Sequence, residues 1–113
     1  MAWDRPDVYY SPEKFGLEVV AAFERPGLSY EFDMFGIWRH VETGQLYYGH
    51  DSGCSCPSPF ETFTSPDKLT PGTAQEVIAK AREWAYGMQL DGRIFEVELM
   101  LLTYESARLA ALA

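Results

Sequence analysis

"YEFDMFGIWRHVETGQLYYGH", residues 30–50, is the stretch that decides the fold. Residues 30–40 and 46–50 are rich in aromatic and other strand-favouring side chains. Residues 42–45, Glu-Thr-Gly-Gln, have the composition of a tight turn. The stretch therefore predicts an antiparallel hairpin in which Gly36 and Gly49 lie near one another. Paired glycines in strands indicate a bulge or a close approach of backbones.

A third strand is predicted on the N-terminal side of the hairpin. Leu17, Val19, Ala21 and Phe23 alternate with neighbours of mixed polarity, as in a strand with one buried face. The Arg-Pro-Gly sequence at residues 25–27 predicts the turn that separates this strand from the hairpin. We therefore expect a three-stranded antiparallel meander.

Two helices are predicted after the hairpin. Thr73 and Glu76 have the spacing of a capping box, and the helical face that follows is apolar. That face comprises Val77, Ala81, Trp84, Ala85 and Met88. The first half of residues 93–113 alternates as a strand would, but the Leu, Met, Glu and Ala content, without Gly or Pro, favours a helix. The expected fold is a single α+β domain over residues 1–113, with the meander packed against two C-terminal helices.

The C-terminal helix carries two apolar stripes. One comprises Phe95, Leu99, Leu102 and Leu109, and the other comprises Ile94, Val97, Leu101, Tyr104 and Leu112. One stripe is expected to cover the sheet. The other packs on the first helix or stays exposed for a partner or a second copy of the chain.

Composition limits the classes of function. Nine Lys and Arg against 17 Asp and Glu give a net charge of −8, which argues against nucleic-acid binding because phosphates need a cationic surface. No apolar stretch reaches the roughly 18 residues that a membrane span needs, and MAWDRPDVYY lacks the features of a signal peptide. We expect a cytoplasmic protein that binds neither membranes nor a cofactor.

The second unusual stretch is "DSGCSCPSPFE", residues 51–61, which holds both cysteines of the chain. Ser58, Pro59 and Glu61 have the pattern of a capped helical turn. Cysteine also packs well as a small apolar side chain. The favoured interpretation is a rigid strand-to-helix corner with the thiols buried under the aromatic strands. The corner comprises Gly53, which permits an unusual φ, with Cys54, Cys56, Pro57, Ser58, Pro59 and Glu61.

Chemical roles for the same stretch remain open. His50, Cys54 and Cys56 offer three soft metal ligands within seven residues, although structural zinc sites use four. His40 is expected opposite Leu46 or Tyr47, too far along the strands from His50 to complete the set. A strained disulfide and a reactive thiol at Cys56 are further alternatives.

The stretch from Gly53 to Glu61, Gly-Cys-Ser-Cys-Pro-Ser-Pro-Phe-Glu, resembles a family of small uncharacterised proteins encoded by phages of actinobacteria. In that family the motif follows an aromatic hairpin and precedes one or two helices. The resemblance implies a phage origin and a small accessory protein acting in the cytoplasm of the infected bacterium. It implies no activity and no functional residue.

Aromatic residues are abundant, at 15% of the chain, and exposed Tyr and Trp are common anchors of protein interfaces. We therefore expect a non-enzymatic binding protein whose acidic charge steers it to a basic host or phage protein. Its expected contact residues are Trp38, Tyr47 and Tyr48 of the hairpin, and Leu101 and Tyr104 of the C-terminal helix. The chain could also form a homodimer through this helix. A small metal-binding domain and a minor structural protein of the virion are the alternatives.

Overall fold

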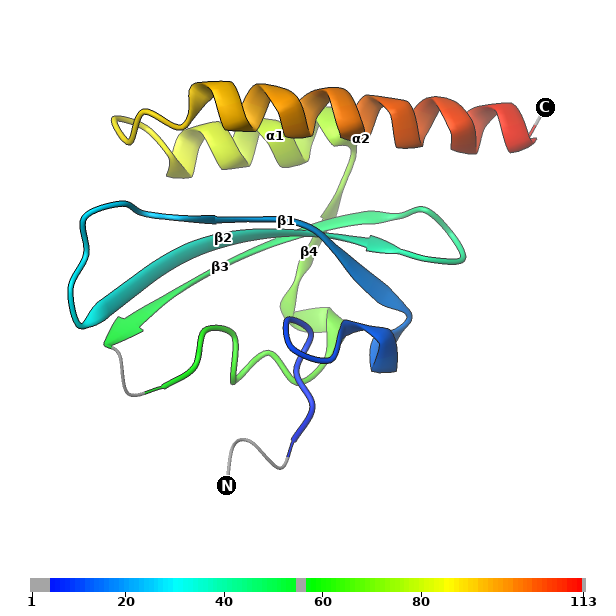
Figure 1. The fold of residues 1–113 in the computed structure, drawn as a ribbon. Coiled ribbons are helices and arrows are strands. Elements are labelled where there is room, and N and C mark those ends of the chain that lie inside the picture. Colours follow the sequence, from blue (N-terminus) through cyan, green and yellow to red (C-terminus); the bar gives the residue numbers. More distant parts are fainter. Residues whose placement is uncertain (1–4, 55–56, 113) are drawn as a thin grey trace.

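The protein is a twisted antiparallel sheet with helices on one face and loops on the other (Figure 1). A computed structural model describes residues 5–54 and 57–112. The strands β1 (Leu17–Glu24), β2 (Glu31–His40), β3 (Leu46–Cys54) and β4 (Thr70–Gly72) follow one another in the sheet in chain order. Helices α1 (Ala74–Trp84) and α2 (Asp91–Leu112) form the covering layer. Two short 3₁₀ helices, η2 (Pro12–Phe15) and η3 (Pro66–Lys68), belong to the segments below the sheet.

These elements confirm the expected α+β class, the meander and both helices, but the sheet has four strands rather than three. The fourth strand, β4, pairs antiparallel with β3 through three residues. Its sequence, Thr-Pro-Gly, has none of the usual strand composition, and Pro71 is tolerated because β4 lies at the edge of the sheet. Strand β3 also runs four residues beyond His50, into the cysteine stretch.

The register of the hairpin places the two glycines in direct contact. Gly36 pairs with Gly49, and Arg39 pairs with Leu46. The backbone N–H of His40 donates to the carbonyl of Gln45 at 2.8 Å, so His40 does not face Leu46 or Tyr47 as expected. The actual register differs from the expected ones by one or two residues because the turn is tighter.

The glycine pair makes room for an indole ring. A Cβ atom on Gly36 would lie 2.5 Å from Cη2 of Trp38, and one on Gly49 would lie 2.7 Å from Cδ2 of Leu69. The Trp38 side chain is fully buried, and its Nε1–H donates to the carbonyl of Val8 at 2.8 Å. The indole therefore lies across the hairpin and fixes the N-terminal segment to the sheet. The core on this face comprises Val8, Leu17, Phe32, Met34, Trp38, Phe60 and Leu69.

The other face of the sheet packs on the helices. The capping box at the start of α1 is confirmed, since Glu76 N–H donates to Thr73 Oγ1 at 3.2 Å and Thr73 N–H donates to Glu76 Oε1 at 3.0 Å. The predicted apolar face of α1 enters this core, with Trp84 at its margin. The strands contribute Ala21, Phe23, Phe35, Ile37 and Leu46 to it.

A β-bulge in β1 explains why its alternation was misinterpreted. Val19 pairs with Trp38 and Ala21 pairs with Ile37, so Val20 is an extra residue. Leu17 and Val19 consequently face the Trp38 side, whereas Ala21 faces the helices. The prediction of one buried face along the whole strand was wrong because the bulge shifts the alternation.

We expect Gly36→Ala to destabilise the protein by about 1–3 kcal/mol, because the added methyl group collides with the benzo ring of Trp38. In a Trp38→Phe background the ring atoms that collide are gone, so the same substitution should cost less than about 1 kcal/mol. Urea denaturation of the four chains in this double-mutant cycle measures the difference. An equal cost in both backgrounds would show that the indole does not require the glycine.

Candidate functional site

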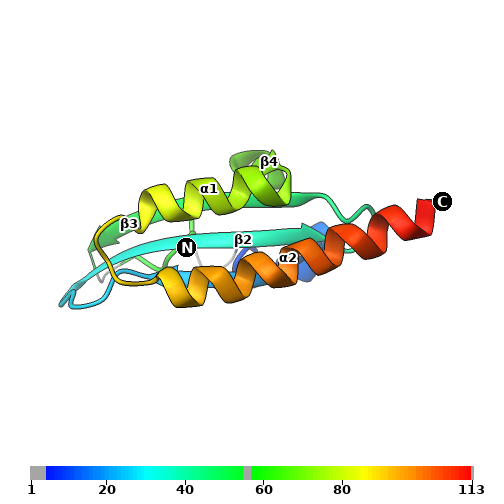
Figure 2. The same cartoon turned by 90° about the horizontal axis from the view of Figure 1, so that it is seen from above.

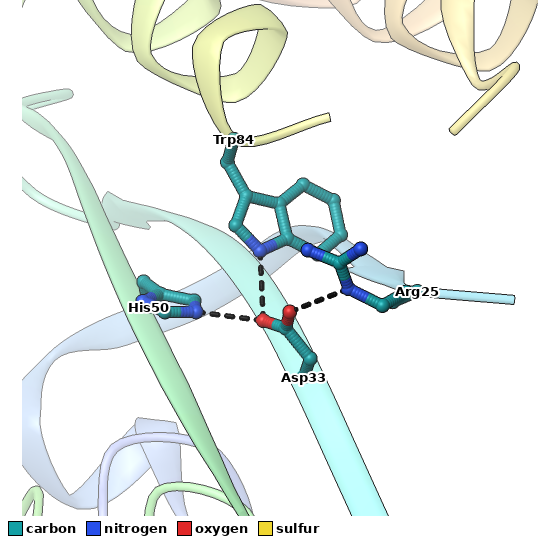
Figure 3. A network of polar contacts seen from close by, with 4 residues as sticks. All are labelled: Arg25, Asp33, His50 and Trp84. Carbon is teal, nitrogen blue, oxygen red and sulfur yellow. Dashed lines mark hydrogen bonds and ion pairs between the residues drawn. The ribbon is translucent and has the colours of Figure 1, made fainter. Parts of the chain in front are cut away.

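A carboxylate near one end of the sheet contacts residues from the end of β1, from β3 and from helix α1 (Figure 3). Asp33 lies on β2 on the helix side, at 17% side-chain exposure. Its Oδ2 accepts from Nε of Arg25, just after β1, at 2.7 Å. Its Oδ1 lies 2.7 Å from Nε2 of His50 on β3, and it accepts from Nε1 of Trp84, the last residue of α1, at 2.9 Å. We call these four residues the Asp33 network.

The surroundings of Asp33 keep it ionised. Partial burial raises the pKa of this carboxyl, but the hydrogen bonds from Trp84, Arg25 and His50 outweigh burial and hold the pKa below its usual range. Both oxygens are engaged, and a general acid or base works best with a pKa near the working pH. The Asp33 network is therefore better suited to holding α1 on the sheet than to proton transfer.

Sequence reasoning missed this network. The available signal was an aspartate inside an aromatic strand, because Asp is depleted in strands unless a specific partner retains it. The spacing of Arg25, Asp33, His50 and Trp84 along the chain gives no further indication. Three separate turns of the chain bring them together.

The predicted corner is a turn, not the start of a helix. Glu61 Oε2 accepts from Ser58 N–H at 2.9 Å, which is one half of the expected capping box. Asp51 Oδ2 accepts from Phe60 N–H at 2.7 Å, and Phe60 has a positive φ of 63°. The buried ring of Phe60 packs edge-on against Trp38, with centroids 5.3 Å apart. The aromatic core therefore holds the turn in place.

Two expectations for the corner were wrong. Gly53 is not among the residues with positive φ; its missing Cβ instead leaves space for the ring of Phe32, whose Cε1 would lie 3.2 Å away. Cys54 is exposed rather than buried under the strands. Cys56 lies outside the described residues, so its predicted place in the corner or in a metal site is not described.

The structure brings no further ligands to the predicted metal site at His50, Cys54 and Cys56 within the described residues. His50 is engaged with Asp33. Within residues 5–54 and 57–112, no three His, Cys, Asp or Glu side chains are grouped closely enough to hold a metal ion. A site at Cys54 would need donors from beyond this part of the chain.

The expected contact residues separate into buried and half-buried ones. Trp38 and Leu101 are fully buried, so their expected role in binding a partner was wrong. Tyr47 packs on the Trp38 side of the sheet, and Tyr48 stacks on Phe35 with centroids 5.7 Å apart. Tyr104 is half-buried, with the Arg39 guanidinium 5.0 Å from its ring centre.

Tyr104 belongs to an open groove of about 490 Å³ between the β2–β3 turn and the last turns of α2. Arg39 and Arg108 lie at its walls, and Ala107, Ala111 and Leu112 contribute apolar surface. Arg39 is already paired with Glu18 at 2.7 Å, which leaves Arg108 as the freer cation of the two. The groove is a surface feature where α2 passes beyond the sheet.

Several large apolar residues are exposed on the helix layer, all of them in α2. Of the two stripes on α2, Ile94, Val97 and Leu101 face the sheet. Phe95, Leu99, Leu102 and Leu109 are 47–65% exposed, and we call these four the outward face of α2. In α1 the exposed positions are polar or small, for example Gln75, Lys80 and Glu83. Two adjacent helices in one layer therefore present different surfaces to solvent.

An antiparallel sheet with two helices on one face defines the chain as an α+β protein. The chain belongs to the family described as Domain of unknown function (DUF7574), whose model matches residues 6–106. No curated protein and no solved structure matches it. Among the described residues, no helix has the length and apolarity needed to cross a membrane.

We expect Asp33→Asn to lower the free energy of unfolding by about 2 kcal/mol near neutral pH, because three hydrogen bonds to a charged acceptor are weakened. The pKa of Asp33 is depressed in the folded state. Its stabilisation is therefore complete above the unfolded-state pKa of about 3.9 and is lost as pH falls through the folded pKa. The difference between the two chains should shrink below about pH 4.

Urea denaturation at a series of pH values measures this difference. Asp67→Asn, which changes an exposed carboxyl, is the control and should have little effect. A deficit of Asp33→Asn that stays constant down to about pH 2 would contradict the proposed role of the ionised carboxylate.

Proposed function

We propose that this protein is a non-enzymatic binding protein that docks onto a protein partner through the outward face of α2. The exposure of Phe95, Leu99, Leu102 and Leu109 along one helix is the observation that carries the proposal. Single exposed apolar residues are ordinary, but a contiguous row on a folded helix is typical of an interaction surface.

The energetics favour a partner for this face. Each side chain is already about half removed from water, and covering the rest gains roughly 25 cal/mol per Å² of apolar area. The helix is already folded on the sheet through Ile94, Val97 and Leu101. Binding therefore avoids the cost of ordering a flexible segment, which otherwise offsets much of the gain.

The proposed surface replaces the one expected from the sequence. Trp38 serves the core, and Tyr47 and Tyr48 lie partly under neighbouring side chains. The exposed stripe of α2 is also not the one that contains Leu101. A protein partner remains the favoured class, because the outward face is a long apolar row rather than a concave cavity.

The biological setting of the proposal comes from the sequence. The motif from Gly53 to Glu61 supports a small accessory protein of a phage that acts in the cytoplasm of an infected bacterium. Its partner would then be a protein of the host or of the phage. The net charge of −8 supports a protein partner over a nucleic acid.

Photo-crosslinking tests the docking surface. We expect that benzoylphenylalanine placed at Phe95, which keeps an aromatic ring there, gives a protein adduct when the chain is produced in an actinobacterial host and irradiated. The same group at Tyr86, which is 91% exposed on the loop between α1 and α2, should give no specific adduct.

Mass spectrometry identifies the adducts. Adducts of equal yield at both positions would reflect exposure alone and would contradict a docking role for α2. Complete absence of adducts at Phe95 in producing and infected cells would do the same.

A further inference from the structure

We infer that the outward face of α2 binds a second copy of the chain, forming a symmetric dimer in which the two α2 helices pack antiparallel. This inference rests on the proposed docking role of α2 and names its occupant. It is supported by the spacing of the exposed residues, the sizes of the residues that would face each other, and the distribution of charge along α2.

The exposed row has the spacing of a coiled-coil seam. Gly92, Phe95, Leu99, Leu102, Ser106 and Leu109 follow one another at intervals of three, four, three, four and three residues. All six positions are exposed, and they are apolar or small. This spacing suits packing against another helix through a coiled-coil seam, and the sheet-facing row of Ile94, Val97, Leu101 and Tyr104 has the same three-four-three intervals. A helix with a matching seam fits this face, and a second copy of the chain provides one.

An antiparallel register matches large residues with small ones. With Leu99 opposite Leu102 of the second copy, Phe95 faces Ser106 and Leu109 faces Gly92 on both sides of the symmetry axis. A Cβ atom on Gly92 would meet nothing within 4 Å, so the space above this glycine is open. Facing layers of alternating size interdigitate best, which favours this register.

Charge along α2 favours the same orientation. The first half of the helix, residues 91–101, carries three acids and Arg93, whereas the second half, residues 102–112, carries one acid, Glu105, balanced by Arg108. An antiparallel pair places each acidic half beside the neutral half of the other copy, while a parallel pair would place the two acidic halves together. Glu98 also forms an ion pair with Arg82 of α1 at 2.9 Å, which reduces its repulsion of acidic residues on the second copy.

The extent of the surface is compatible with a small dimer interface. Covering the outward face would bury roughly 400 Å² of apolar area per copy, about half of a standard interface, before flanking residues are counted. Figures 1 and 2 show α2 extending past the end of α1, so its second half can be approached freely. Each copy has a net charge of −8, so general repulsion opposes the dimer, and salt should strengthen it.

Light scattering after size-exclusion chromatography tests the dimer. At protein concentrations of about 0.1 mM, the mass of the wild type should be twice 12.8 kDa. Leu99→Glu and Leu102→Glu should return it to the monomer mass, because each places two carboxylates in the seam. Met100→Glu is the matched control: Met100 is a neighbouring exposed apolar residue outside the seam, and this variant should remain dimeric.

Salt and crosslinking test the arrangement. The dimer fraction should rise between about 0.05 M and about 0.5 M NaCl, the reverse of a complex held by opposite charges. Benzoylphenylalanine at Phe95 should crosslink to the second copy, and digestion after glutamate separates residues 99–105 from 106–113. An adduct on residues 102–113, located by fragmentation of the two peptides, supports the antiparallel pair, whereas an adduct on residues 91–101 overturns that orientation.

The outcomes separate this inference from the proposed function. A monomer mass for the wild type at all concentrations and salts overturns the dimer, as does a dimer that Leu99→Glu and Leu102→Glu leave intact. If the monomeric chain still gives a specific adduct with another protein at Phe95, the docking role of α2 stands and its occupant is that protein. If the chain is monomeric and Phe95 gives no adduct, both fail.

Discussion

The packing of Trp38 against the Gly36–Gly49 pair is the constraint on which the rest of the structure depends. The indole occupies the space that a Cβ atom of Gly36 would fill and lies against Gly49, where Leu69 fills the corresponding space, and its N–H donates to the carbonyl of Val8. Because the ring covers both strands of the hairpin, it fixes their register at a point where a slip by one residue would turn every side chain to the other face. Phe60, in the turn at residues 57–62, then packs on the same ring.

With one face of the sheet closed in this way, the helices need to cover only the other. Asp33 fixes the end of α1 through the indole N–H of Trp84, and it keeps Arg25 and His50 at the same point. Helix α2 is joined to α1 by the Arg82–Glu98 pair and by Glu105, which accepts from the N–H of Ala74 at 2.9 Å. The layer is therefore held by the apolar packing of both helices on the sheet and by these polar contacts, and the outward face of α2 takes no part in holding it.

The sequence predicted the elements that local pattern determines. The hairpin, the strand at residues 17–24 and the capped start of α1 follow from composition and spacing, and the structure confirms them. Strand β4 was missed because Thr-Pro-Gly forms a strand only when β3 offers it an edge. The bulge at Val20 and the Asp33 network depend on contacts between distant segments, which no local pattern encodes.

The sequence led us to expect the stripe with Leu101 at the surface of α2, but that stripe faces the sheet and the other one is exposed. Leu99 and Leu101 are the same residue type, and the two stripes to which they belong are both apolar. The sequence alone therefore could not tell which stripe faces the sheet. The sheet selects the stripe with Ile94, Val97 and Leu101, while Glu98 and Glu105 turn toward α1. The remaining stripe then points to solvent along the length of the helix. A helix that served only the core would be expected to have polar residues there, as α1 does, and the Phe and Leu residues on the outward face are therefore the basis of the docking proposal.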